Sequence, residues 1–138
     1  MSSYVLSLLL AVVACVIGGA LGGIALARPA GLAGSADGQA APAPRLTEAR
    51  TLGGLLIVSH AGAALYLGYQ PSVGAAMAFV LALAWFGAAL GQIASVMIDP
   101  TEGRPNLGNL AFALLIAATL ALPFLNPARL VLRGGMMV

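Results

Sequence analysis

Long apolar stretches separated by short polar segments dominate the chain. Four stretches are apolar almost throughout, at 4–27, 50–67, 72–98 and 107–125. A helix needs about 20 apolar residues to cross the hydrocarbon core of a bilayer. Because lipid cannot hydrogen-bond backbone N–H and C=O groups, such stretches are expected to be helical. The pattern therefore predicts an all-α fold, an integral membrane bundle of four transmembrane helices.

The three connections between these stretches differ in length and character. The first, 28–49, is a polar loop rich in Pro, Gly and Ala, and the third, 99–106, is short and charged. The second is a tight turn around Pro71, which should make the second and third helices an antiparallel hairpin. No positive charge precedes the first stretch, so we expect a retained membrane helix rather than a signal peptide. Residues 1–138 are expected to form a single domain.

Composition supports a membrane location. The chain is 61% hydrophobic and only 7% charged, with a mean hydropathy of +1.02. A soluble domain carries about 25% charged residues. The net charge of +2 comes from six scattered arginines against four acids, which is not the clustered basic surface that nucleic acid requires. The expected partner is the lipid bilayer, and nucleic acid is not expected.

The distribution of arginine predicts an orientation. Four arginines flank the first and third connections and two lie near the C-terminus: Arg28, Arg45, Arg50 and Arg104, against Arg129 and Arg133. Positive residues are enriched in cytoplasmic loops. This predicts that 28–49 and 99–106 lie on the cytoplasmic side of the membrane.

Small residues recur every fourth position in three stretches. They form the patterns Gly18-xxx-Gly22, Gly19-xxx-Gly23, Gly87-xxx-Gly91-xxx-Ser95 and Ala113-xxx-Ala117-xxx-Ala121. Residues four apart share a helix face, and small side chains let two backbones approach closely. The patterns favour close packing within the bundle and leave open an interface with a second copy or a partner.

Charged residues gather where helices are expected to meet the membrane surface. Thr47 is expected to cap the second helix, with Glu48 in its first turn, where the helix dipole favours an acid. Arg50 can reach water or lipid phosphate, or pair with an acid of the third connection. The predicted interface charges are Glu48, Arg50, Asp99, Glu102 and Arg104.

The single histidine, His60, lies about ten residues into the second stretch, near the middle of the bilayer. Ionisable residues there are costly and often mark function. One interpretation is a neutral histidine that hydrogen-bonds near Ser59, to Gln92 or Ser95, or to a backbone carbonyl on another helix. The others are a proton relay, a substrate contact, or a cofactor-binding ligand to a haem or pigment. Because no acid lies within any stretch, the first is favoured.

Motifs for catalysis are missing from the sequence. It contains no nucleotide-binding loop, no cysteine pair, no metal-ligand spacing and no Ser/His/Asp grouping, which are the usual signatures of such chemistry. Cys15 is the only cysteine. We therefore expect no enzyme activity, no metal and no tightly held cofactor.

The second stretch opens with the motif TEARTLGGLLI at 47–57, in which an acid and an arginine precede a glycine pair. The residues are Glu48, Arg50, Gly53 and Gly54. The third stretch and its connection read GQIASVMIDPTEGRPN at 91–106. Together these motifs resemble the small bacterial four-helix membrane family catalogued as domain of unknown function 4345.

The second motif departs from the family in two places. Gly91 matches, but Gln92 stands where the family has arginine. Asp99 also matches, and Gly103-Arg104-Pro105 follows after an insertion. The resemblance covers 45–125 and implies a four-helix membrane fold. It implies no activity, because the family has none established.

Together with the resemblance, these observations predict a non-catalytic polytopic protein of a bacterial inner membrane. The first hypothesis is a structural or accessory subunit packed against a larger membrane complex, with other membrane subunits or a second copy as its partner. The alternative is a small solute or proton-coupled transporter that uses His60, Gln92 and Ser95 as a polar track.

Overall fold

The computed structural model describes residues 2–32, 43–98 and 107–126. These residues form four long helices and one short helix: α1 (Ser3–Ala27), α2 (Pro29–Leu32), α3 (Ala43–Tyr69), α4 (Pro71–Ile98) and α5 (Leu107–Leu125). The predicted all-α architecture is confirmed for this part of the chain. All four long helices are long and apolar enough to cross a membrane.

Local chemistry sets both ends of α1. The Ser2 side chain accepts a hydrogen bond from the Val5 backbone N–H at 3.4 Å, which caps the first turn. At the other end, the Arg28 N–H donates to the Ile24 carbonyl at 2.8 Å. Pro29 then begins α2, since a proline in the first turn of a helix leaves no backbone donor unpaired.

The start of α3 differs from the prediction. The helix begins at Ala43 rather than at residue 50, so Thr47 lies inside it and is not its cap. Pro44 occupies the first turn, where a missing N–H costs nothing. Thr51 continues the helix and donates its hydroxyl to the Thr47 carbonyl at 2.9 Å. The predicted polar loop 28–49 is therefore partly helical, at both of its ends.

Helices α3 and α4 are joined through one residue. The Gln70 N–H donates to the Tyr66 carbonyl at 2.8 Å, and the Gln70 carbonyl accepts from Val73 and Gly74 at 3.0 Å. A Cβ added to Gly74 would overlap the backbone of Leu67. This close approach lets the two helices fold back on each other directly.

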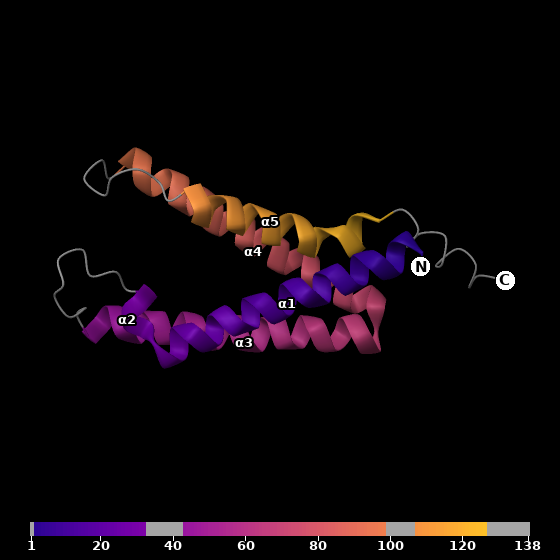
Figure 1. The fold of residues 1–138 in the computed structure, drawn as a ribbon, viewed down its shortest axis with the longest axis horizontal. Helices are drawn as coiled ribbons and strands as arrows, with labels where there is room; N and C mark the ends of the chain where they lie inside the picture. Colours follow the sequence, from indigo (N-terminus) through magenta and orange to yellow (C-terminus); the bar gives the residue numbers. More distant parts are fainter. Residues whose placement is uncertain (1, 33–42, 99–106, 127–138) are drawn as a thin grey trace.

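The long helices are arranged as two pairs. Helix α1 packs along α3, and α4 packs along α5. Figure 1 shows that the pairs meet at the end that holds the start of α1, the α3–α4 turn and the end of α5. They diverge toward the opposite end, where α2 and the start of α3 lie.

The core occupies the half of the molecule where the pairs meet. Its buried residues are mostly small: Ala11, Ala14, Cys15, Ala63, Leu67, Ala78, Ala82, Ile116 and Leu120. Alanine at these positions lets the helices approach closely, which favours dispersion contacts between them. Between α4 and α5 the rings of Phe79 and Phe124 also stack, with centroids 4.5 Å apart.

Glycine makes the contact between α1 and α3 possible. A Cβ added to Gly22 would lie 2.6 Å from the Gly53 carbonyl oxygen, and one added to Gly53 would lie 2.7 Å from the Gly22 oxygen. A Cβ on Gly18 would overlap the His60 ring. Three of the predicted packing glycines are thus used inside the bundle.

Other glycines of the same patterns face outward. A Cβ added to Gly19, Gly23, Gly87 or Gly91 would meet no described atom of a neighbouring helix within 4 Å, and the same holds for Gly54. The internal contact favoured for Gly87 and Gly91 is therefore not formed with any described residue, and the buried small residues of α4 are mostly alanines instead. Those alanines include the buried Ala78, Ala82 and Ala89.

Candidate functional site

A hydrogen bond between two side chains connects the two helix pairs. The indole Nε1–H of Trp85, on α4, donates to Nε2 of His60, on α3, at 3.0 Å. The two rings meet edge to face, with centroids 6.1 Å apart. His60 is only 1% exposed. The polar atoms of both side chains are thereby satisfied inside an apolar bundle.

The second nitrogen of His60 fixes its protonation pattern. Nδ1 lies 2.8 Å from the Leu56 carbonyl oxygen. Since Nε2 accepts from Trp85, Nδ1 must carry the proton and donate it to that carbonyl. The Ser59 hydroxyl donates to the same oxygen at 3.3 Å. His60 is therefore a neutral histidine with a partner at each ring nitrogen.

Apolar contacts close the site from two further helices. Gly18 of α1 lies against the His60 ring, where it leaves no room for a side chain. On the other side of the indole, Phe112 of α5 meets Trp85 edge to face at 5.9 Å. The His60–Trp85 pair is thus in contact with residues of α1 and α5 as well as joining α3 to α4.

The structure pairs His60 with a residue that the sequence does not single out as its partner. Gln92, Ser95 or a backbone carbonyl on another helix were expected as partners, but the ring nitrogens of His60 bond to the Leu56 carbonyl of its own helix and to Trp85 instead. The expected contact with Ser59 is present, with its Oγ 3.3 Å from Nδ1. Gln92 is two turns beyond Trp85 on the same face of α4, toward the diverging end. An indole N–H in the middle of an apolar helix needs a hydrogen-bond acceptor. This requirement could have identified Trp85 as a candidate partner of His60 from the sequence.

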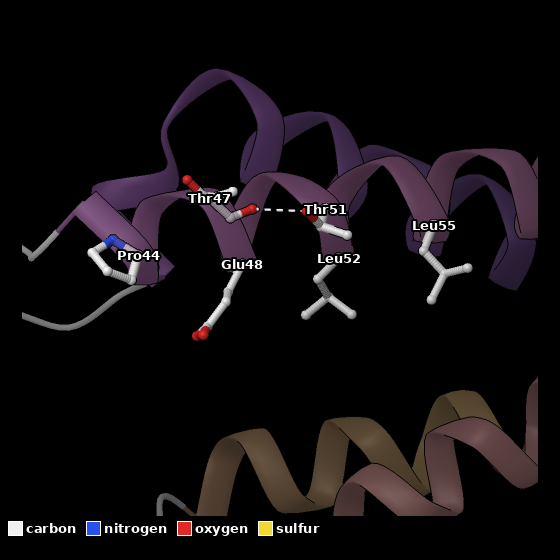
Figure 2. A pocket seen from close by; sticks show the side chains of 6 residues that line it. All are labelled: Pro44, Thr47, Glu48, Thr51, Leu52 and Leu55. Carbon is white, nitrogen blue, oxygen red and sulfur yellow. Dashed lines mark hydrogen bonds between the residues drawn. The ribbon is translucent and has the colours of Figure 1, made fainter.

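On the N-terminal side of His60, α3 carries an open hollow on its surface. It measures about 600 Å³ and its lining comes from one helix: Pro44, Thr47, Glu48, Thr51, Leu52 and Leu55. Figure 2 shows Glu48, Leu52 and Leu55 projecting from α3 toward the side where α4 and α5 lie. The hollow is therefore on the face of α3 that looks across the divergence of the two pairs.

The lining changes character along the helix. Glu48 lies about a turn inside the start of α3, and Leu52 and Leu55 follow one and two turns deeper. Leu52 is 54% exposed and Leu55 is 65% exposed. Figure 2 draws the hydrogen bond from the Thr51 hydroxyl to the Thr47 carbonyl. The hollow thus has one carboxylate at its outer end and an apolar wall beyond.

The other predicted interface charges are only partly described. Arg50 is exposed on α3. Asp99, Glu102 and Arg104 lie outside the described residues, so the proposed pairing of Arg50 with an acid of 99–106 stays a prediction. Among the residues that the structure describes, no group of three or more His, Cys, Asp or Glu could hold a metal ion.

Cofactor ligation by His60 would require a rearrangement. A haem or pigment metal would need an imidazole nitrogen lone pair, and the one at Nε2 accepts the Trp85 N–H. Nδ1 carries a proton and faces its own helix. The ligand hypothesis therefore requires Trp85 to move away, and the resting arrangement favours a packing role for His60.

Fold and site together define a class of protein. The described chain is an all-helical bundle with four helices able to cross a membrane and a histidine–tryptophan pair at its centre. Comparison with protein-family models, with curated proteins and with solved structures gives no match. The resemblance to domain of unknown function 4345 stays a prediction, and a function must be argued from the geometry alone.

Proposed function

We propose that this chain is a non-catalytic multi-pass membrane protein that packs, as a structural or accessory subunit, against another membrane protein. In this proposal it resides in a bacterial inner membrane with 28–49 and 99–106 in the cytoplasm. The observation that carries the proposal is the outward position of two glycine pairs, Gly19/Gly23 on α1 and Gly87/Gly91 on α4.

The two glycine pairs on α1 show what such a surface can do. Gly18 and Gly22 bring α1 against α3 so closely that neither position has room for a Cβ. A Cβ added to Gly19 or Gly23, one residue further along, would instead meet no described neighbouring atom within 4 Å. In a bilayer, helices associate through close van der Waals contact at small residues rather than through hydrophobic burial. A second face of this kind supports packing against a helix of a partner.

The central polar pair supports the same role. His60 has a hydrogen-bonding partner at each ring nitrogen and is almost fully buried. A proton relay or a substrate contact needs a nitrogen that can change its partner, which here would leave the Trp85 N–H unpaired in an apolar environment. The pair is better suited to holding the helices together.

Mild purification of the tagged chain from its native membrane tests the proposal. Mass spectrometry should identify a stoichiometric membrane partner, or native mass spectrometry a second copy. We expect the association to be lost in Gly19→Leu/Gly23→Leu or Gly87→Leu/Gly91→Leu. Ala61→Leu also introduces a leucine, at an exposed position of α3, and should retain the association. A solitary wild-type monomer would refute the proposal, and an absorption band in the sample would redirect attention to His60.

A second candidate is supported by the hollow on α3. A small solute or proton-coupled transporter would use the space between the diverging pairs, with Glu48 at its mouth and Gln92 on the face of α4 that Trp85 occupies. His60 and Ser95 complete the polar track of this proposal. It predicts solute or proton flux in liposomes that His60→Ala and Gln92→Ala each abolish. Absence of flux with the wild-type protein would argue against it.

A further inference from the structure

The face of α3 that is turned toward α4 and α5 carries the open hollow described above. It measures about 600 Å³, and all of its lining residues belong to α3. Because no described residue of another helix lines it, the hollow is open to a molecule from the surrounding bilayer.

The lining favours a hydrocarbon chain over water in the deeper part. Leu52 and Leu55 present most of their side chains to the hollow and are 54% and 65% exposed. Neither offers a hydrogen bond to water. The Thr51 hydroxyl, beside them, already donates to the Thr47 carbonyl. Contact with an acyl chain therefore costs less free energy here than an ordered water molecule does.

The charge of Glu48 indicates which chemical group would lie at the outer end of the hollow. The Glu48 carboxylate projects into the same hollow at its outer end. The rise of an α-helix, about 1.5 Å per residue, places Leu55 about 10 Å deeper than Glu48. A molecule with a cationic head and a hydrocarbon tail matches this order, whereas an anionic headgroup would be repelled by the carboxylate.

We propose that the hollow on α3 binds one phospholipid with an ethanolamine headgroup. Its ammonium group pairs with the Glu48 carboxylate, and one acyl chain lies along Leu52 and Leu55. A primary ammonium group donates hydrogen bonds to a carboxylate, which a quaternary choline group cannot do. The bound lipid covers this face of α3.

Native mass spectrometry of the full chain, released from nanodiscs, tests this binding. The nanodiscs contain phosphatidylethanolamine and phosphatidylglycerol in equal amounts and with identical acyl chains. We expect one retained lipid, with the ethanolamine form favoured about threefold to fivefold, the effect of one partly exposed ion pair. Glu48→Gln should bring this ratio close to one, and Glu48→Asp should largely keep it.

A matched pair of variants tests the position of the acyl chain. Leu55→Trp fills the hollow and should reduce the fraction of protein that retains a lipid at least about threefold, by loss of contact area. Leu65→Trp makes the same change on α3 at a residue outside the lining that is 69% exposed, and should leave that fraction unchanged.

Two results would overturn the proposal: a wild-type chain that retains no lipid, or an ethanolamine preference that survives Glu48→Gln. The outward glycines are a different surface from the hollow. Lipid retention therefore fails or succeeds independently of partner co-purification, and the two proposals are judged separately.

Discussion

The Nε1–H of Trp85 donates a hydrogen bond to Nε2 of His60 across 3.0 Å, from α4 to α3. It joins the pair formed by α1 and α3 to the pair formed by α4 and α5. Water is scarce at this depth, so each group depends on the other for its hydrogen bond. This dependence makes the pair the most informative target for mutation.

Trp85→Phe should destabilise the bundle by about 1–2 kcal/mol, because it leaves the buried Nε2 of His60 without a donor. Since Trp85 is the chain's single tryptophan, its fluorescence cannot report on the variant. Circular dichroism during titration with sodium dodecyl sulfate measures the free energy of unfolding instead. In the double variant His60→Leu/Trp85→Phe no polar group is left unpaired, so its loss should be about 1 kcal/mol smaller than the sum of the single losses. Strictly additive losses would show that the hydrogen bond contributes nothing.

Gly18→Ala and Gly19→Ala compare two neighbouring positions with opposite surroundings. The added methyl group at Gly18 overlaps the His60 ring, whereas at Gly19 it enters open space. Overpacking should cost Gly18→Ala about 1–3 kcal/mol. Gly19→Ala should stay within about 0.5 kcal/mol of the wild type or be more stable, since alanine favours a helix over glycine. The same unfolding titration measures both, and equal effects would contradict the α1–α3 contact described above.

Leu120→Ala should be costly although it lies in a membrane helix. Leu120 is 0% exposed in the core, whereas Leu122, on the same helix, is 43% exposed. Truncation leaves a cavity, but in lipid little transfer free energy from water is lost, so we expect about 2 kcal/mol, the low end for such changes. Leu122→Ala should cost less than about 0.5 kcal/mol. In the same titration, Leu120→Ala should unfold at a lower detergent concentration than Leu122→Ala. The reverse order would show that Leu120 does not lie in the core.

Cys15 provides a test of the fold without mutation. Its side chain is 2% exposed and belongs to the core cluster. A maleimide should therefore modify it at least about tenfold more slowly in mild detergent than after denaturation, because reaction requires the helices to open. Rapid modification of the native protein would show that α1 does not pack on the other helices as described.

The sequence was sufficient for the architecture. An apolar stretch of about 20 residues can satisfy its backbone in lipid only as a helix, and α5 has the predicted bounds of 107–125. The start of α3 was predicted too late. The rule that charge and a capping residue mark a helix start failed there, because Thr47, Glu48 and Arg50 are also acceptable inside a helix. Pro44, further upstream, was the better signal.

For the site, the sequence singled out His60 but not its partner. Burial depth follows from position in a stretch, which is why a histidine ten residues into a span needs a partner. Gln92 and Ser95 were the candidates because their polar side chains can hydrogen-bond to an imidazole. Trp85 forms the bond because the crossing of α3 and α4 brings its N–H to Nε2, and no periodicity within one helix contains that information.

What the sequence determined by itself is therefore the set of elements: four apolar helices, a hairpin at Pro71 and a polar residue that must find a partner inside. Only the tertiary structure decided which of two adjacent glycine patterns on α1 faces inward. It also decided where the helix pairs diverge to expose Glu48, Leu52 and Leu55 to a common hollow. The physical reason is that hydrophobicity in a bilayer fixes which segments are helical but does not distinguish one apolar face from another. That choice depends on the shapes of faces brought together from distant parts of the chain.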